Sequence, residues 1–263
     1  VLILSSCGYK KEAKEVTRNF FSAIKNEKVG KMEELYPDIE NLQNYYKSDT
    51  IIFKEIVDLG ENKYSVTVTN KFTNGFGKSK ESQIIIFAKP KDAKKPKDGY
   101  EIYDSKGLCN FSDDAMYKFA KRKGYIAGNS LTDQEVATKV LEASKELIKI
   151  AVKFTTYLRD NVTVSDWNWE TNDYSYSASG RGVVKNNTKY AIPDVKYVVT
   201  YTKRDGTEVT QDEGSITYGE IRPYGMESFS FYTPYVGNAS RASIRLEFDK
   251  DFIFETVAKG EFE

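Results

Sequence analysis

TDQEVATKVLEASKELIKIAVKFTTYLRD, residues 132–160, is the stretch that decides the fold. It opens with Thr132-Asp133-Gln134-Glu135, a capping box in which the threonine hydroxyl can accept from the glutamate amide while the glutamate reaches back to the threonine amide. Apolar side chains then recur at helical spacing over roughly seven turns. They are Val136, Val140, Leu147, Ile148, Ala151, Phe154 and Leu158. One small sheet cannot cover an apolar face of that length, so this helix is predicted to connect two domains.

The residues before this helix predict helices followed by a sheet. Apolar residues from Ala13 to Ile24 recur at helical spacing and indicate a helix ending near Gly30, and a second helical stretch runs from Met32 to Tyr46 with Pro37 kinking it or starting a new turn. Four segments rich in β-branched and aromatic residues follow, with turn formers between them. They lie at residues 51–57, 64–72, 84–87 and 100–103. This order predicts a curved antiparallel sheet whose concave face the two helices cover.

A helical connector is predicted between this domain and the rest of the chain, over residues 109–160. A shorter helix around residues 115–122, closed by Gly124, is expected to pack beside the long helix as an antiparallel hairpin.

Beyond the long helix the apolar period changes to two. Val195, Tyr197, Val199 and Tyr201 alternate with other residues, and Asp205-Gly206 marks a tight turn. Further alternating segments and regularly placed turns continue to the C-terminus, which predicts an antiparallel β-sandwich over residues 161–263. The whole chain is therefore predicted to belong to the α+β class.

Two resemblances refine this organisation. Residues 13–108 resemble the nuclear-transport-factor-two-like, cystatin-like cone domains of small bacterial lipoproteins, through their element order, the Phe20-Phe21 helix and the segment Ser105-Lys106-Gly107-Leu108. Residues 180–188, GRGVVKNNT, fit the pattern G-x-V-x-N-x-[ST] and are similar to the FxLYD family of envelope sandwich domains. The name-giving motif is not kept, because residues 199–203 read VTYTK, and the family brings no catalytic residues to this chain.

The N-terminal residues predict a lipid anchor. Leu4-Ser5-Ser6-Cys7 resembles the bacterial lipobox, which implies that Cys7 is acylated and becomes the first residue of the mature protein. Residues 1–6 fit the end of a signal peptide, since a membrane span needs about 20 apolar residues. The resemblance implies an envelope protein of the outer membrane, held to that membrane by a lipidated stalk at residues 7–12.

Composition argues against several classes of function. The chain has no histidine, which excludes catalysis by histidine-dependent triads or imidazole bases and excludes metal sites with histidine ligands. An acylated Cys7 cannot pair with Cys109, the other cysteine, so neither a disulfide nor a zinc site is predicted and Cys109 is expected to be a packed thiol. The 39 basic residues balance 39 acidic ones, which argues against nucleic-acid binding. No metal or cofactor is expected.

Carboxylate chemistry is the remaining catalytic alternative. The nominal acid pairs are Asp113-Asp114, Asp166 with Glu170, and Asp212-Glu213. Such pairs could serve a histidine-free hydrolase of envelope polysaccharide. In so charged a chain they more often form solvated turns or helix caps, and Asp113-Asp114 precedes a predicted helix. The chain is therefore predicted not to be an enzyme and to have no catalytic residues.

An aromatic strand face is the predicted binding site. Trp167 and Trp169 lie on one side of a strand, with Tyr174 and Tyr176 close behind. These rings could stack on a glycan or hold an envelope protein, or they could be buried in the sandwich. The sequence thus favours a non-catalytic binding or assembly module.

A lysine-rich connection precedes the fourth predicted strand. Its members are Lys89, Lys91, Lys94, Lys95 and Lys97. They either blunt a sheet edge or contact anionic lipid headgroups or polysaccharide.

Overall fold

The computed structural model describes residues 3–42, 46–73, 79–111, 114–128, 130–172 and 176–263, with the backbone alone for residues 3–7, 40 and 41. The chain divides into two compact units, Val1–Ser144 and Lys145–Glu263. Both contain helices and antiparallel sheet, so the predicted α+β class is confirmed. The long helix α4, Asp133–Asn161, contributes to both units, because the division falls within it.

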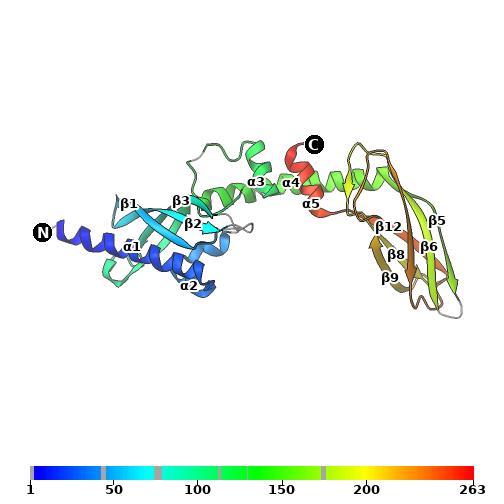
Figure 1. Ribbon diagram of the computed structural model, residues 1–263, viewed down its shortest axis with the longest axis horizontal. Coiled ribbons are helices and arrows are strands. Elements are labelled where there is room, and N and C mark those ends of the chain that lie inside the picture. Colours follow the sequence, from blue (N-terminus) through cyan, green and yellow to red (C-terminus); the bar gives the residue numbers. More distant parts are fainter. Residues whose placement is uncertain (1–2, 43–45, 74–78, 112–113, 129, 173–175) are drawn as a thin grey trace. The chain divides into compact units, whose positions relative to one another are not determined.

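Unit 1 consists of a four-stranded antiparallel sheet with helices packed on it (Figure 1). The strands pair in the order β1-β2-β3-β4, as the sequence predicts; they are β1 (Thr50–Gly60), β2 (Lys63–Thr73), β3 (Ser79–Pro90) and β4 (Tyr100–Lys106). The helices are α1 (Ile3–Lys25), α2 (Val29–Leu35) and α3 (Ala115–Arg122), with 3-10 turns η1 (Pro37–Asn41) and η2 (Pro96–Asp98).

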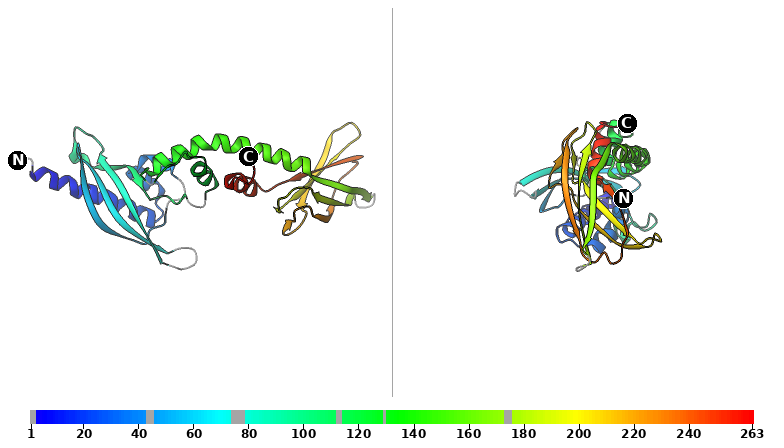
Figure 2. Two further views of the ribbon diagram at one scale, coloured as in Figure 1. Left: turned by 90° about the horizontal axis from the view of Figure 1, so that it is seen from above. Right: turned by 90° about the vertical axis from the view of Figure 1, so that its right-hand side faces the viewer.

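The core of unit 1 lies between the sheet and α1, which runs along one sheet face (Figure 2). Alternate strand residues point to that face and are buried; they include Val66, Val68, Ile84, Ile86 and Ile102. The helices supply aromatic rings, and Phe20 packs edge-on against Phe21 and Tyr36 with ring centroids 5.6 and 5.8 Å apart.

The N-terminal helices differ from the prediction in their limits. α1 begins at Ile3, so residues 7–12, predicted as a stalk, are helical; Lys10, Lys11 and Glu12 all favour helix. α1 also ends at Lys25, before Gly30. The second helix is shorter than predicted, because Pro37 forces an extended Tyr36 before it and then opens η1.

Both helices of the predicted connector are present, with the predicted capping box at α4. The Thr132 amide donates to Glu135 Oε2 at 2.8 Å, and the Glu135 amide donates to Thr132 Oγ1 at 3.3 Å. α3 has its own cap, in which Asp114 Oδ1 accepts from the amides of Met116 and Tyr117 at 2.7 and 3.2 Å.

Unit 2 is a sandwich of two three-stranded antiparallel sheets, ordered β11-β6-β5 and β12-β8-β9, with β7 and β10 paired separately. The strands are β5 (Val162–Asn172), β6 (Ser177–Asn186), β7 (Ile192–Pro193), β8 (Lys196–Thr202), β9 (Glu208–Ser215), β10 (Glu220–Ile221), β11 (Met226–Thr233) and β12 (Arg241–Glu247). The sheets meet where the Tyr197 ring lies 5.4 Å from Phe229 and the Tyr201 hydroxyl lies 3.0 Å from Thr233 Oγ1. The predicted sandwich is thus present.

The G-x-V-x-N-x-[ST] motif holds the end of β6. Asn186 is completely buried, and its Nδ2 donates to the carbonyls of Tyr190, Ile221 and Arg222 at 2.7, 3.2 and 3.0 Å. Its Oδ1 accepts from the Thr188 amide and hydroxyl at 2.9 and 2.7 Å. The motif therefore ties β6 to the segment before β11.

A C-terminal helix, α5 (Lys250–Lys259), is not predicted by the sequence pattern. Asp249 caps it by accepting from the Phe252 amide at 2.7 Å, and Gly260 closes it in the left-handed conformation. The Phe154 ring of α4 lies 5.9 Å from Phe252 and 4.7 Å from Phe262, so α5 and the residues after it cover α4 within unit 2.

Candidate functional site

The first turn of α4 is fixed to the end of β4 by a buried carboxylate. Asp133 is 4% exposed and accepts three hydrogen bonds, from Ser105 Oγ at 2.7 Å, the Leu108 amide at 2.9 Å and the Gly107 amide at 3.2 Å. Charge-assisted bonds of this kind compensate a carboxylate for the loss of water. They also hold the first turn of α4 against the end of β4.

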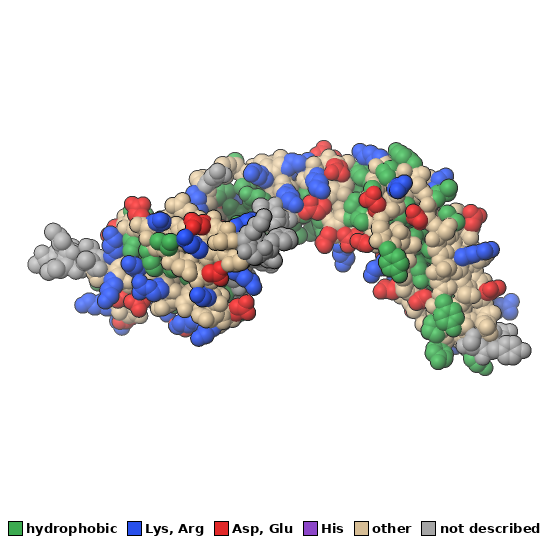
Figure 3. Space-filling model, in the orientation of Figure 1, with side chains coloured by type: hydrophobic (Ala, Val, Ile, Leu, Met, Phe, Trp, Pro, Cys, Tyr) green, Lys and Arg blue, Asp and Glu red, His purple; other side chains and the backbone are tan. Residues whose placement is uncertain are grey.

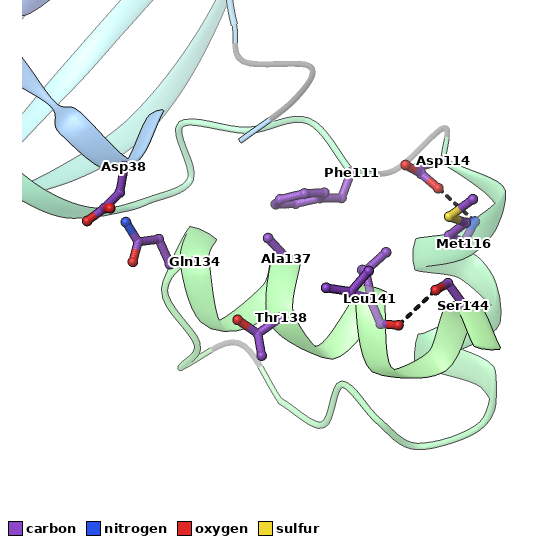
Figure 4. A pocket seen from close by; sticks show the side chains of 10 residues that line it. Asp38, Phe111, Asp114, Met116, Gln134, Ala137, Thr138, Leu141 and Ser144 are labelled. Atoms are coloured by element: carbon purple, nitrogen blue, oxygen red, sulfur yellow. Dashed lines mark hydrogen bonds between the residues drawn. The ribbon is translucent and has the colours of Figure 1, made fainter. Parts of the chain in front are cut away.

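A groove of about 410 Å³ lies beside this end of α4, within unit 1. Its lining comes from η1, the residues before α3, α3 itself and the first three turns of α4. The lining residues are Asp38, Phe111, Asp114, Met116, Gln134, Ala137, Thr138, Val140, Leu141 and Ser144. Figure 4 shows Phe111 above Ala137, with Asp38 and Gln134 at one end and Met116 and Ser144 at the other.

The floor of the groove is apolar and supported from behind. Phe111 and Ala137 are partly buried and pack against the core of unit 1, and the Phe111 ring stacks on Tyr117 at 5.6 Å. Leu141 stands at the groove with 68% of its surface exposed. Covering this packed floor and the exposed leucine with an apolar group would be favourable, because it removes apolar surface from water.

Most polar groups around the groove are already used within the protein. Gln134 Nε2 donates to the Tyr36 hydroxyl at 3.5 Å and the Tyr103 carbonyl at 3.4 Å, and Ser144 Oγ donates to the Leu141 carbonyl at 2.8 Å. Asp114 caps α3, while Asp38 and Thr138 are exposed at the rim. The groove therefore offers apolar contact with a thin polar rim.

Burial raises the pKa values of two ionisable groups behind the groove. It raises the pKa of the Asp104 carboxyl above its ordinary value, an effect that hydrogen bonds from Thr132 and nearby amides oppose and the charge of Asp133 reinforces. Burial also raises the pKa of the Cys109 thiol, again with a contribution from Asp133. Cys109 is buried in the core cluster and stays a thiol at neutral pH, which does not suit a nucleophile.

The nominal acid pairs occupy structural positions. Asp113 lies outside the described residues, and Asp114 is a helix cap. Asp166 and Glu170 are both exposed on β5, and Asp212 accepts from Thr233 Oγ1 at 2.9 Å. Glu213, beside Asp212, is exposed on β9.

The predicted aromatic face is divided between the sandwich and its surface. Trp169 is half-buried and meets the buried Tyr201 ring edge-on at 5.4 Å. Trp167 is also half-buried, whereas Tyr176 is 64% exposed. Tyr174 lies outside the described residues. The two tryptophans therefore do not form an open face with Tyr176.

Exposed tyrosines at the tip of the sandwich are a surface that the sequence reasoning missed. Tyr176 directly precedes β6 and Tyr235 follows β11, and the Val236 amide donates to the Tyr176 carbonyl at 2.7 Å. Tyr232 is exposed on β11 nearby. Figure 3 shows apolar side chains in green at this tip. Tyr176 and Tyr235 both have left-handed φ angles, 51° and 58°. Asparagine and glycine adopt such angles more readily than tyrosine, so no sequence pattern predicts them here.

Among the described residues, no helix combines the length and apolar character needed to cross a membrane. No group of three or more cysteine and carboxylate side chains among them could hold a metal ion.

Comparisons with known proteins yield a distant structural likeness. No protein-family model matches the chain, and no curated protein sequence matches it. Among solved structures, a crystal structure of a DUF1425 family member from Shewanella sp. pv-4 is similar to it over 34% of this chain and 78% of that one, with 13% identity and a TM-score of 0.25.

Proposed function

We propose that this chain is a lipid-anchored protein of the outer membrane that binds an apolar segment of an envelope partner protein and catalyses no reaction. The lipobox-like Leu4-Ser5-Ser6-Cys7 supports the anchor, because a diacylglycerol group on Cys7 with a further acyl chain supplies stable attachment. The groove beside α4 is the observation that carries the binding role.

The groove has the properties of a binding site for an apolar group. Its volume lies within the range of roughly 300–1,000 Å³ that ligand pockets span. Its floor residues, Phe111 and Ala137, are held by the core, so little order needs to be gained when a partner binds. Burying a leucine such as Leu141 contributes about 1.5–3 kcal/mol, enough to make it an anchor of the contact.

No comparable observation supports the polysaccharide hydrolase. A glycosidase needs two carboxyl groups facing each other across one cleft. Asp38 and Asp114 both line the groove, but they lie at its opposite ends, and Asp114 caps α3 (Figure 4). Asp212 hydrogen-bonds Thr233 within the sandwich. We therefore retain the binding function alone.

Site-specific photo-crosslinking tests the groove in living cells. A photoreactive residue replaces Thr138 at the rim, and the same residue at Glu142, exposed on α4 but outside the lining, serves as the control position. We expect one discrete adduct from position 138 and none from position 142, with the partner peptide identified by mass spectrometry.

A pair of matched substitutions makes this test specific. Leu141→Asp places a charge in the groove, while Val152→Asp places one at a similarly exposed position, 61% against 68%, elsewhere on α4. The adduct from position 138 should disappear with Leu141→Asp and persist with Val152→Asp. An adduct that survives Leu141→Asp would show that the groove is not the binding site.

The anchor is tested separately by intact mass measurement of the protein isolated from its host. Wild-type protein should carry an acylated Cys7 as its first residue, and Cys7→Ser should carry no lipid. Wild-type protein without acyl mass would refute the anchor and leave the groove experiment unaffected.

A further inference from the structure

Three segments of unit 1 meet at the end of the sheet where α1 begins. The Tyr9 ring of α1 lies 6.4 Å from that of Tyr100, the first residue of β4. The Tyr100 hydroxyl donates to the Asn62 carbonyl in the β1–β2 turn at 2.9 Å. The connection 91–99 ends directly before Tyr100, so its lysines lie at the same end as the residues that follow Cys7. The sequence alone could not place them together.

We name this surface the basic end, and it consists of exposed lysines from two segments. They are Lys10, Lys11, Lys91, Lys94, Lys95 and Lys97. Among the described residues, Lys94, Lys95 and Lys97 form no ion pair, whereas Lys91 lies 4.0 Å from Glu34. Figure 3 shows blue lysine and arginine side chains over this part of unit 1, with some red carboxylates among them.

Carboxylates at the same end reduce this charge without cancelling it. Residues 8–12, 58–63 and 91–98 hold seven lysines and five carboxylates, in a chain that is neutral as a whole. Three of the carboxylates are occupied locally. Glu61 pairs with Lys63 at 3.0 Å, Asp58 accepts from the Gly60 amide at 2.8 Å, and Asp92 accepts from the Lys94 amide at 2.8 Å. The Lys91 amide donates to the Gly99 carbonyl at 3.0 Å and closes the loop at its base.

We infer that the basic end binds anionic lipid headgroups and thereby holds unit 1 against the membrane surface. This inference rests on the proposed acylation of Cys7, which would place the lipid two helical residues, or about 3 Å of helix rise, before Tyr9. Charge complementarity and continuity with the anchor both favour a membrane as the occupant. A lysine near an anionic membrane surface strengthens binding by roughly fivefold, so the net charge of this end is sufficient for measurable binding.

Vesicle binding by the full chain carrying Cys7→Ser tests the headgroup contact without the lipid. The vesicles are phosphatidylcholine with or without phosphatidylglycerol. One variant replaces Lys91, Lys94, Lys95 and Lys97 with glutamine, and a control variant replaces Lys139, Lys145, Lys149 and Lys153 of α4, which removes the same charge elsewhere. Circular dichroism verifies that each variant is folded.

We expect binding to phosphatidylglycerol vesicles that weakens with salt, falls about tenfold or more in the loop variant and changes less than threefold in the α4 variant. Equal binding by wild type and the loop variant, or equal binding to neutral vesicles, would overturn the inference. Binding to a soluble anionic polysaccharide without binding to vesicles would also overturn it. The mass of Cys7 is measured independently, so an absent acyl group with intact vesicle binding would refute the anchor alone.

Discussion

Asp133 Oδ2 accepts a hydrogen bond from Ser105 Oγ at 2.7 Å, and this contact joins the first turn of α4 to the end of β4. The same carboxylate also receives the amides of Gly107 and Leu108. The position of the groove floor depends on it, because Ala137 lies one turn further along α4. A single buried side chain thus links the sheet of unit 1 to the candidate site.

Asp133→Ala should destabilise unit 1 by about 3 kcal/mol, because the Ser105 hydroxyl and the Gly107 and Leu108 amides lose a buried acceptor. Cys109 in a Cys7→Ser background reports this selectively, since it is then the only thiol and lies in the core of unit 1. Its alkylation under native conditions should become much faster in Asp133→Ala. Glu135→Ala, which removes the exposed half of the capping box, should have a smaller effect of about 1 kcal/mol. Equal alkylation rates in the two variants would contradict this role for Asp133.

The capping box and the Asp133 contact differ in whether neighbouring residues predict them. Thr132 and Glu135 are predictable because both partners lie within four residues, and the strands of unit 1 are predictable from their alternation. The second use of this turn, Asp133 bonded to Ser105, joins residues 28 apart and follows from packing alone. The groove depends on the same long-range placement of Asp38, Phe111 and α4, so no local pattern predicts it.

Asp104→Asn should increase the free energy of unfolding of unit 1, and the increase should be larger at pH 7 than at pH 4. Burial raises the pKa of Asp104 in the folded protein above its unfolded value, so the folded state holds the proton more tightly. Stability from this group is therefore present below about pH 4 and is lost as pH rises through the folded pKa. The effect is isolated by comparing urea unfolding with and without Asp104→Asn at both pH values, always in the Cys7→Ser background. Exposure of Cys109 is read with a disulfide reagent that reacts with thiols at acidic as well as neutral pH. The gain from the substitution should be larger at pH 7.

Glu81→Gln is the control of opposite sign in the same unit. Its hydrogen bond and charge interaction with Lys71, at 2.8 Å, lower the pKa of Glu81. The glutamate contributes stability above its unfolded pKa, and that contribution is lost as pH falls through the folded pKa. The variant should therefore lose stability at pH 7 and lose less at acidic pH. If both variants changed in the same direction with pH, the assignment for Asp104 would be wrong.

Asn186→Ala should destabilise unit 2 by about 2–4 kcal/mol, because three carbonyls, two of them in buried hydrogen bonds, lose their donor and Thr188 loses its acceptor. Both tryptophans of the chain, Trp167 and Trp169, belong to unit 2, so tryptophan fluorescence during urea unfolding reports on this unit. Asn187→Ala, the neighbouring exposed asparagine, should change the midpoint little. A comparable fall of the urea midpoint in both variants would mean that the buried hydrogen bonds of Asn186 do not stabilise unit 2.

Unit 2 also marks where prediction from sequence fails. The strand alternation predicts the sandwich. It does not predict α5, because the apolar residues of α5 are explained only by their packing against Phe154 of α4. Trp169 illustrates the reverse case, since its strand position is predictable while its packing on Tyr201 depends on the opposite sheet. The left-handed φ angles at Tyr176 and Tyr235 contradict local preference, so no local pattern predicts them.

Gly180→Ala should destabilise the sandwich by about 1–3 kcal/mol, because there is no room for a methyl group beside β11 and β5. A Cβ on Gly180 would lie 2.1 Å from the Phe231 ring and 2.5 Å from the Asn168 carbonyl oxygen. The ring can turn aside, but the Asn168 oxygen belongs to the paired strand β5, which would have to shift. Gly219→Ala provides the matched control, since a Cβ there meets nothing within 4 Å and its φ is not left-handed. Urea midpoints from tryptophan fluorescence should fall for Gly180→Ala and stay near wild type for Gly219→Ala. Equal midpoints for Gly180→Ala and wild type would mean that β5 and β6 can separate at little cost, and the close approach would then not explain the glycine at position 180.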